Sequence, residues 1–263
     1  MIETLQFETP DGATTGARVA GRSGPGLVFV HGVGSTAAIW DAQLRAFASD
    51  FRCAAIELRG NGALADPDPE LITRAGFAVD VLAATRALGF ERFTIVGCSL
   101  GGVVAFELWQ RAPERIDAMV IVGSFAQYPK GEAYAASIIA ALQETGDMQS
   151  FAKARATRLN LPPDRLEETI EQMACKSVPC YRASTQATWT GDYRSVLASI
   201  DVPVAVLCGE RDTIAPVALS REIADGIAGA RLSLVEGAGH VANADAPERF
   251  NALLREFLTV NAS

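Results

Sequence analysis

Short, continuously apolar runs recur along the chain and alternate with segments of helical periodicity. The apolar runs cover residues 26–31, 52–58, 92–98, 116–124, 202–209 and 230–237. The helical patterns cover residues 36–48, 73–88, 100–112, 217–228 and 245–259. Strands that are apolar at successive positions, rather than at every second one, are typical of a sheet covered on both faces. The alternation therefore predicts an α/β fold, with a mostly parallel sheet and helices on both sides of it.

Two parts of the chain depart from this alternation. Residues 4–9 and 15–21 flank a turn-forming Pro-Asp-Gly sequence and predict an antiparallel hairpin at one edge of the sheet. Residues 125–195 carry helical patterns and no strand pattern, and glycines and prolines interrupt them. We therefore expect a core made of residues 1–124 and 196–263, with a helical insertion at 125–195.

Composition narrows the class of protein. Of 263 residues 49% are hydrophobic, enough for a large core, and the formal net charge is −8. That charge argues against a nucleic-acid partner and against docking on an anionic membrane, since both require basic patches. No apolar run is long enough to span a membrane, and the N-terminus lacks a signal-peptide pattern. The five cysteines lack metal-ligand spacing and there are two histidines, so we expect a cytoplasmic protein with reduced thiols and no metal site.

The sequence Gly-Cys-Ser-Leu-Gly at 97–101 places two candidate nucleophiles side by side, between a predicted strand and a predicted helix. In a nucleophile elbow the strand and the helix approach so closely that the positions two before and two after the nucleophile favour glycine. Centred on Ser99, those positions are Gly97 and Gly101. Centred on Cys98, they would carry Val and Leu side chains, which would clash. The spacing therefore favours Ser99 as nucleophile and Cys98 as a wall residue, the alternative being a chance pentapeptide in a turn.

A serine nucleophile needs a base, and the base needs an orienting acid. His240 follows the last predicted strand, where it is a candidate base; the alternative is a loop histidine with a structural hydrogen bond. Asp212 follows the preceding strand and is the favoured acid, with Glu210 in reserve; Asp212 could instead cap the next helix. The chain order of Ser99, Asp212 and His240 is the order of a hydrolase triad.

The negative charge that develops on an acyl oxygen needs two preorganised donors. The backbone N–H of Leu100 is one candidate, because it opens a helix whose dipole also favours an anion. The N–H of Val33, in the sequence HGVGST after the strand at 26–31, is the second candidate. We interpret His31 as a structural residue that shapes this loop, and not as a second base.

Taken together, the motifs resemble those of the α/β-hydrolase superfamily. They are FVHGVGSTAAIW, ELRGNG, GCSLGG, RAPERI, CGERD and GAGHVANADAPERF, and they span residues 26–124 and 202–260. The chain looks most like the small enol-lactonase and carboxylesterase group typified by 3-oxoadipate enol-lactonase. The resemblance implies the α/β-hydrolase fold: an eight-stranded, mostly parallel sheet whose second strand is antiparallel, with a helical lid after the sixth strand. The insertion at 125–195 falls at that place.

The chain departs from the family pattern at three positions. Asn61 stands where D-x-R-G-H-G has its histidine, Cys98 precedes the nucleophile where His, Leu or Trp is common, and Asp245 replaces the usual Glu before the last helix. None of these positions belongs to the triad, and Asn61 is expected to alter the wall of the pocket.

The sequence therefore predicts a serine hydrolase that cleaves a small carboxylic ester or lactone with water, through an acyl-enzyme on Ser99 and without a cofactor. A carbon–carbon bond hydrolase or a cofactor-free perhydrolase of the same fold is the alternative, and a non-catalytic small-ligand receptor is the alternative of another class. The oligomeric state stays open. Candidate substrate-binding residues in the insertion are Met173, Tyr181, Trp189 and Arg182, and Arg155 and Arg158 are further arginines that could bind a substrate carboxylate.

Overall fold

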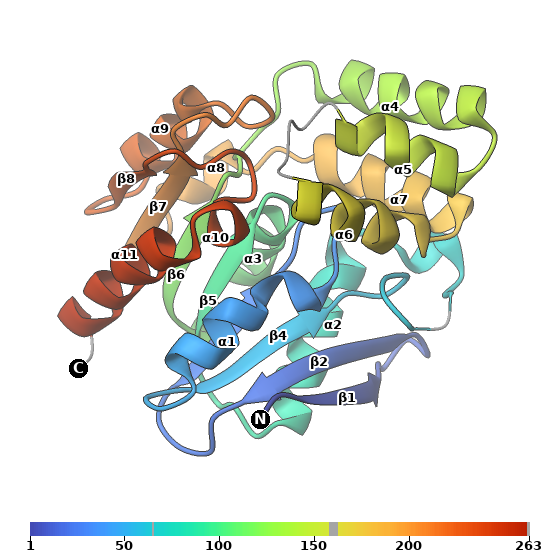
Figure 1. The fold of residues 1–263 in the computed structure, drawn as a ribbon. Helices are drawn as coiled ribbons and strands as arrows, with labels where there is room; N and C mark the ends of the chain where they lie inside the picture. Colours follow the sequence, from blue (N-terminus) through green and yellow to red (C-terminus); the bar gives the residue numbers. More distant parts are fainter. Residues whose placement is uncertain (65, 158–162, 262–263) are drawn as a thin grey trace.

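The structure of the protein is a computed structural model that describes residues 1–64, 66–157 and 163–261. Within these residues eight strands form one sheet in the order β1-β2-β4-β3-β5-β6-β7-β8 (Figure 1). The strands are β1 (Glu3–Glu8), β2 (Thr14–Ala20), β3 (Gly26–Val30), β4 (Arg52–Glu57), β5 (Phe93–Cys98), β6 (Ile116–Val122), β7 (Val204–Gly209) and β8 (Arg231–Val235). Strand β2 is antiparallel to both of its neighbours, and the remaining pairs are parallel. The predicted eight-stranded, mostly parallel sheet with an N-terminal hairpin is confirmed.

Helices cover both faces of this sheet (Figure 1). One face carries α2 (Arg74–Ala87), α3 (Leu100–Arg111) and α9 (Val217–Gly226), and the other carries α1 (Asp41–Phe47) and α11 (Pro247–Val260). The shorter helices are η1 (Ala37–Trp40), η2 (Pro69–Leu71), η3 (Pro113–Arg115), α8 (Arg194–Leu197) and α10 (Ala242–Asp245). The five helical patterns outside the insertion therefore all correspond to helices of the core.

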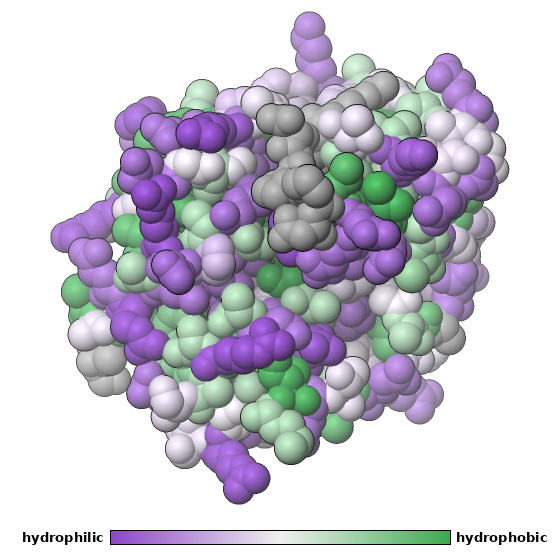
Figure 2. Space-filling model, viewed as in Figure 1, coloured by the Kyte–Doolittle hydropathy of each residue, from purple (hydrophilic) through white to green (hydrophobic). Residues whose placement is uncertain are grey.

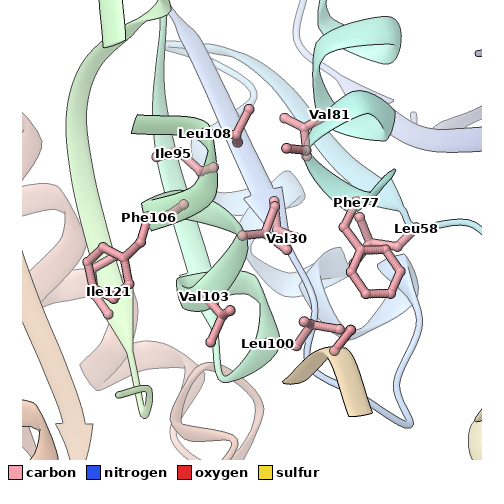
Figure 3. Close-up of a cluster of buried hydrophobic side chains, with 14 of the residues drawn as sticks. Val30, Leu58, Phe77, Val81, Ile95, Leu100, Val103, Phe106, Leu108 and Ile121 are labelled. Carbon is pink, nitrogen blue, oxygen red and sulfur yellow. The ribbon is translucent and has the colours of Figure 1, made fainter. Parts of the chain in front are cut away.

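Alternate residues of the central strands point into two different clusters of buried apolar side chains. Val30 and Ile95 belong to the cluster that includes α2 and α3, whereas Phe29 and Val96 belong to the cluster that includes α1 and α11. Figure 3 shows part of the first cluster, where side chains of β3, β5 and β6 lie against α3 and α2. Because both faces are covered, every residue of β5 is buried, which explains the continuous apolar runs.

Four helices follow β6 and form what we call the helical layer. They are α4 (Gly131–Thr145), α5 (Met148–Thr157), α6 (Pro163–Ala174) and α7 (Val178–Trp189). In Figure 1 they lie over one end of the sheet, next to the loops that follow the parallel strands. The ring of Trp189, at the end of α7, packs against three aromatic rings from the stretch after β6 and from α4, with centroids 5.2 Å from Phe125, 4.6 Å from Tyr128 and 4.8 Å from Tyr134.

The two ends of the segment that carries the helical layer lie side by side. The Tyr193 N–H donates to the carbonyl of Ala126 at 2.8 Å, and Gln127 and Asp192 form an antiparallel bridge. The chain thus leaves the sheet after β6 and returns to nearly the same place. The division into 1–124, 125–195 and 196–263 stays a prediction, and this pairing supports it.

Polar and apolar residues are mixed on the face of the molecule that Figure 2 shows. Areas of hydrophilic residues alternate there with areas of weakly and strongly hydrophobic residues. Among the described residues, no helix is both long and apolar enough to cross a membrane. The five cysteines carry free thiols, and all except Cys175 are buried.

Candidate active site

The turn between β5 and α3 has the geometry of a nucleophile elbow. Ser99 sits at its apex with φ +54° and ψ −113°, a conformation that L-residues seldom adopt. A Cβ built on Gly97 would lie 2.2 Å from the carbonyl oxygen of Gly101, and a Cβ on Gly101 would lie 2.2 Å from that of Val30. Backbone atoms cannot yield to such contacts, so the two glycines allow the close approach that aims the serine outward.

Cys98 is adjacent but chemically different. Its side chain is buried, with the sulfur 4.0 Å from the carbonyl oxygen of His240. Burial, together with the nearby carboxylates of Asp212 and Asp245, raises the pKa of the Cys98 thiol far above its ordinary value. The thiolate is the reactive form of cysteine, so Cys98 is a neutral wall group, in agreement with the glycine spacing.

The structure brings the candidate base and acid together. His240 Nδ1 lies 2.8 Å from Asp212 Oδ2, while Asp212 Oδ1 accepts the N–H groups of Ile214 at 2.8 Å and Ala215 at 2.9 Å. The carboxylate is thus held from both sides. A Cβ on Gly123 would lie 3.0 Å from Asp212 Oδ2, so the carboxyl end of β6 also needs a glycine here. With Nδ1–H donating to Asp212, Nε2 is left to accept a proton.

Glu210, the alternative candidate for the acid, contacts a different part of the chain. Glu210 is exposed, and its carboxylate accepts the N–H of Gly237 at 3.0 Å. Asp212 is therefore the acid that the geometry favours for His240.

The two candidate oxyanion donors flank the serine. Leu100 is the first residue of α3, and Val33 lies in the loop after β3, where a Cβ on Gly32 would be 3.2 Å from Ser99 Cβ. Within the described part of the chain, neither the Val33 N–H nor the Leu100 N–H makes a hydrogen bond. Both are therefore free to bind a developing negative charge.

His31 is buried and shapes the same loop. Its Nδ1 lies 2.9 Å from the carbonyl of Gly32, and its Nε2 lies 3.3 Å from the N–H of Leu58 and 3.2 Å from Glu57 Oε1. These contacts support a structural role and leave the ring no nitrogen for a substrate.

A cavity of about 70 Å³ opens beside Ser99 and His240. Its walls come from the loops after β3, β5, β7 and β8 and from the helical layer. The lining residues are Gly32, Val33, Gly34, Ser35, Ile39, Cys98, Ser99, Arg155, Arg165, Thr169, Gln172, Met173, Trp189, Ile214, His240 and Val241. The volume accommodates a compact group rather than a long chain.

Some of the predicted substrate-binding residues line the cavity and others do not. Met173 and Trp189 line the cavity, and their contact with substrate stays a prediction. Tyr181 does not line it: it is fully buried, 5.2 Å from the ring of Phe151, and lies behind the cavity wall. Arg182 of α7 is exposed and is not among the residues that line the cavity. Arg158 lies outside the described residues.

Two other arginines line the cavity, Arg155 of α5 and Arg165 of α6. Arg155 is half-buried, and no described carboxylate forms an ion pair with it; its titratable neighbours are the hydroxyls of Tyr181, Tyr134 and Tyr128. The sequence analysis named Arg155 as one of three arginines that could bind a carboxylate, and it did not name Arg165. The pattern of one helix does not show which of its sides the next helix covers.

Buried donors without partners gather at this cavity. Arg165 Nε and Trp189 Nε1 are both buried and make no hydrogen bond to any described group. The described lining residues include no Asp or Glu. Since unpaired buried donors are costly, the arrangement fits a ligand rich in acceptor oxygens.

Metal chemistry has no candidate site in the described ranges. No group of three or more His, Cys, Asp or Glu side chains there is placed to hold a metal ion.

This chain is similar in sequence and in fold to known hydrolases. The model of the alpha/beta hydrolase family matches residues 27–253. A putative carbamate hydrolase RutD of Cronobacter turicensis is 26% identical over 238 residues, covering 88% of this chain and 89% of that protein. The 3-oxoadipate enol-lactonase 2 of Acinetobacter baylyi is 28% identical over 234 residues, covering 86% of each. Among solved structures, a hydrolase from Pseudomonas aeruginosa PA01 superposes with a TM-score of 0.89 at 31% identity, covering 97% of this chain and 98% of that one.

Proposed function

The chain belongs to the alpha/beta hydrolase family, and from this premise we propose that it is a serine hydrolase that cleaves small carboxylic esters or lactones through an acyl-enzyme on Ser99. The observation that carries the proposal is the pairing of His240 Nδ1 with Asp212 Oδ2 at 2.8 Å, beside the cavity into which Ser99 projects. A strained serine, an oriented imidazole and two free N–H donors form the set of groups that acyl transfer requires.

The reaction follows from these positions. Ser99 Oγ attacks the acyl carbon while His240 Nε2 takes its proton, and Asp212 stabilises the imidazolium that forms. The N–H groups of Val33 and Leu100 bind the oxyanion. The alcohol oxygen leaves with the proton from His240, and in a lactone it stays attached to the acyl group. Water then attacks the acyl-enzyme, giving its proton to His240, and Ser99 recovers its proton as the acid departs.

The cavity supports a substrate with a carboxylate of its own. The chain is acidic overall, with a formal net charge of −8, yet two guanidinium groups and no described carboxylate line this cavity. Guanidinium groups bind carboxylates through paired N–H donors. The half-buried Arg155 has tyrosines for neighbours and is the better placed of the two, since Arg165 already pairs with Glu168.

Product analysis separates this proposal from its alternatives. We expect hydrolysis of p-nitrophenyl acetate and of short lactones, and little on long triglycerides, because the cavity is small. Cleavage restricted to vinylogous diketones would instead show a carbon–carbon hydrolase, and acid-to-peracid conversion with hydrogen peroxide would show a perhydrolase. Tight binding of these compounds without turnover would show a receptor.

A further inference from the structure

The loop Gly32–Ser35, which we call the oxyanion loop because it carries Val33, is contacted by the segment Gln172–Lys176 of the helical layer. Ser35 Oγ donates to Gln172 Oε1 at 3.0 Å, and the Ser35 carbonyl accepts from Lys176 Nζ at 3.0 Å. A Cβ on Gly34 would lie 2.9 Å from the terminal methyl of Met173. The loop is thus held between the sheet on one side and this segment on the other.

Lys176 is the unusual member of this segment. Only 4% of it is exposed, although it is a lysine. Its ammonium group donates to two neutral oxygens, the carbonyl of Ser35 and the side-chain oxygen of Asn61. No described carboxylate lies within ion-pair distance of it. A lysine buried on neutral partners is costly, so stability does not account for its presence here.

Asn61 is oriented to receive this lysine. Its Nδ2 donates to the carbonyls of Leu58 and Arg59, both at 2.9 Å, which turns Oδ1 toward Lys176. Asn61 is also the position at which the chain departs from the histidine of its family's motif. The asparagine that stands in place of the family's histidine is therefore the residue that accepts the hydrogen bond of the buried lysine.

We propose that Lys176 is a positioning residue for the oxyanion hole, holding the Ser35 carbonyl so that the Val33 N–H points at the acyl oxygen. The inference rests on the proposed function for its catalytic consequence. The Ser35 N–H donates to the Gly32 carbonyl at 3.2 Å, which closes a turn around Val33. His31 fixes the Gly32 carbonyl, and Lys176 fixes the Ser35 carbonyl, so both sides of the turn are anchored. Lys176 also makes the geometry of this turn depend on the helical layer.

The charge of Lys176 provides a readout. Burial lowers the pKa of Lys176 from 10.5 to about 8, against the opposing attraction of the Glu57 carboxylate; the Cys175 and Cys180 side chains also lie nearby and would attract the ammonium group only as thiolates. Above that pH the amine is neutral and its hydrogen bonds to Ser35 and Asn61 lose their charge assistance. The turn then loosens, and kcat is expected to fall.

Stability is expected to move in the opposite direction. The pKa of Lys176 is lower in the folded chain than the ordinary value that it recovers on unfolding, so between about 8 and 10.5 the unfolded chain binds more protons. The contribution of this group to the free energy of unfolding therefore rises with pH in that window. If Lys176 had a purely structural role, kcat would not fall in the pH range where its contribution to the free energy of unfolding rises.

The test compares Lys176→Met with Lys153→Met, which removes an exposed lysine of α5. Wild type and Lys153→Met are expected to show an alkaline limb in kcat near pH 8. Lys176→Met is expected to lose roughly tenfold or more in kcat, with KM changed by less than about threefold, and to show no limb. Backbone amide NMR of Val33 and Ser35, which needs no turnover, is expected to titrate near pH 8 in wild type and not in Lys176→Met.

The outcomes separate the two proposals. A limb and an amide titration that persist in Lys176→Met, or that are absent from wild type, overturn the role of Lys176. An amide titration that depends on Lys176 in a protein that hydrolyses no ester or lactone supports the anchoring of the loop and overturns the proposed function. Should Lys176→Met not fold, the wild-type titration of Val33 alone decides: its presence near pH 8 supports the contact and its absence overturns it.

Discussion

At the scale of single residues, the proposed chemistry depends on one strained backbone position. Ser99, at φ +54°, turns the chain from strand to helix within one residue, and the contacts of Gly97 and Gly101 allow the turn. Such strain costs of the order of 1–3 kcal/mol and persists where the surrounding structure enforces it. Here the Ser99 N–H donates to the carbonyl of Val122 at 2.9 Å, and the Ser124 hydroxyl donates to the Ser99 carbonyl at 2.7 Å.

The first prediction concerns which of the two adjacent groups reacts. Ser99→Ala is expected to remove nearly all ester hydrolysis, because Ser99 carries the hydroxyl at the elbow, beside the candidate base His240. Cys98→Ala is expected to keep most of it, because the thiol is buried and protonated. A phosphonate probe followed by peptide mapping should locate the label on Ser99. A label on Cys98 would show that the elbow has been centred on the wrong residue.

A second prediction concerns the acid. Asp212→Asn is expected to lower kcat by roughly 10⁴-fold, because the amide favours the wrong tautomer of His240 and cannot stabilise its charged form. Glu210→Gln is the matched control and is expected to change kcat by less than about twofold, since its carboxylate is exposed and bonded to Gly237. Steady-state kinetics on one ester measures both, and the reverse ranking would reassign the acid.

At the scale of elements, the sequence predicts the core better than the helical layer. Strands β5 and β7 are buried at every residue, so their apolar runs are visible without knowledge of their neighbours. The helical pattern at 245–259 corresponds to α11, which begins at Pro247 because proline favours the first turn of a helix. Asp245 belongs to the separate short helix α10, which the pattern does not indicate.

The helical layer is harder to predict because its helices pack on one another as well as on the core. On α7, Tyr181 is fully buried while Arg182 is exposed, and the mixed sequence of that helix does not show which of its sides meets the cavity. Lys176 gives no signal at all, because a lone lysine between two helices is usually solvated. Its burial depends on a loop about 140 residues earlier, which only the folded chain brings near.

The third prediction tests the cavity wall that the layer supplies. Arg155→Ala is expected to raise KM for a half-ester of a short dicarboxylic acid by about 10- to 100-fold, the worth of a hydrogen bond to a charged group. KM for the neutral diester of the same length should change little, because the triad is intact. Arg182→Ala, which removes an exposed arginine of the same layer, should leave both values unchanged. Equal effects of Arg155→Ala on the two esters would indicate a neutral substrate.

At the scale of the whole molecule, one sheet separates two apolar cores. Phe106 of α3 lies in the core on one face, and Phe250 of α11 packs against Trp40 in the core on the other, with ring centroids 6.0 Å apart. The candidate active site lies at the end of the sheet, where loops from both sides meet. Its geometry therefore depends on both cores, although it belongs to neither.

A fourth prediction follows for stability. Phe106→Ala and Phe250→Ala are each expected to lower the free energy of unfolding by about 3–5 kcal/mol, the cost of a cavity left by a fully buried phenylalanine. Because the sheet lies between the two sites, the double variant should lose the sum to within about 0.5 kcal/mol. Urea denaturation followed by circular dichroism measures all three. A double variant far from the sum would show that the two cores are coupled through the strands.

The meeting of Ala126 with Tyr193 has a consequence for how such a protein diversifies. When the two ends of a segment are adjacent, the entropic cost of closing it rises only slowly with its length, by about 0.6 kcal/mol for each doubling, so a change of length there disturbs the neighbouring strands little. We therefore expect that the stretch between these two residues can be exchanged for another one, which would change the substrate selectivity while the residues of the candidate active site keep their places. A replacement segment must also supply a hydrogen-bond donor to the Ser35 carbonyl in place of Lys176. Without one, we expect a variant that folds and binds substrate but has a low kcat.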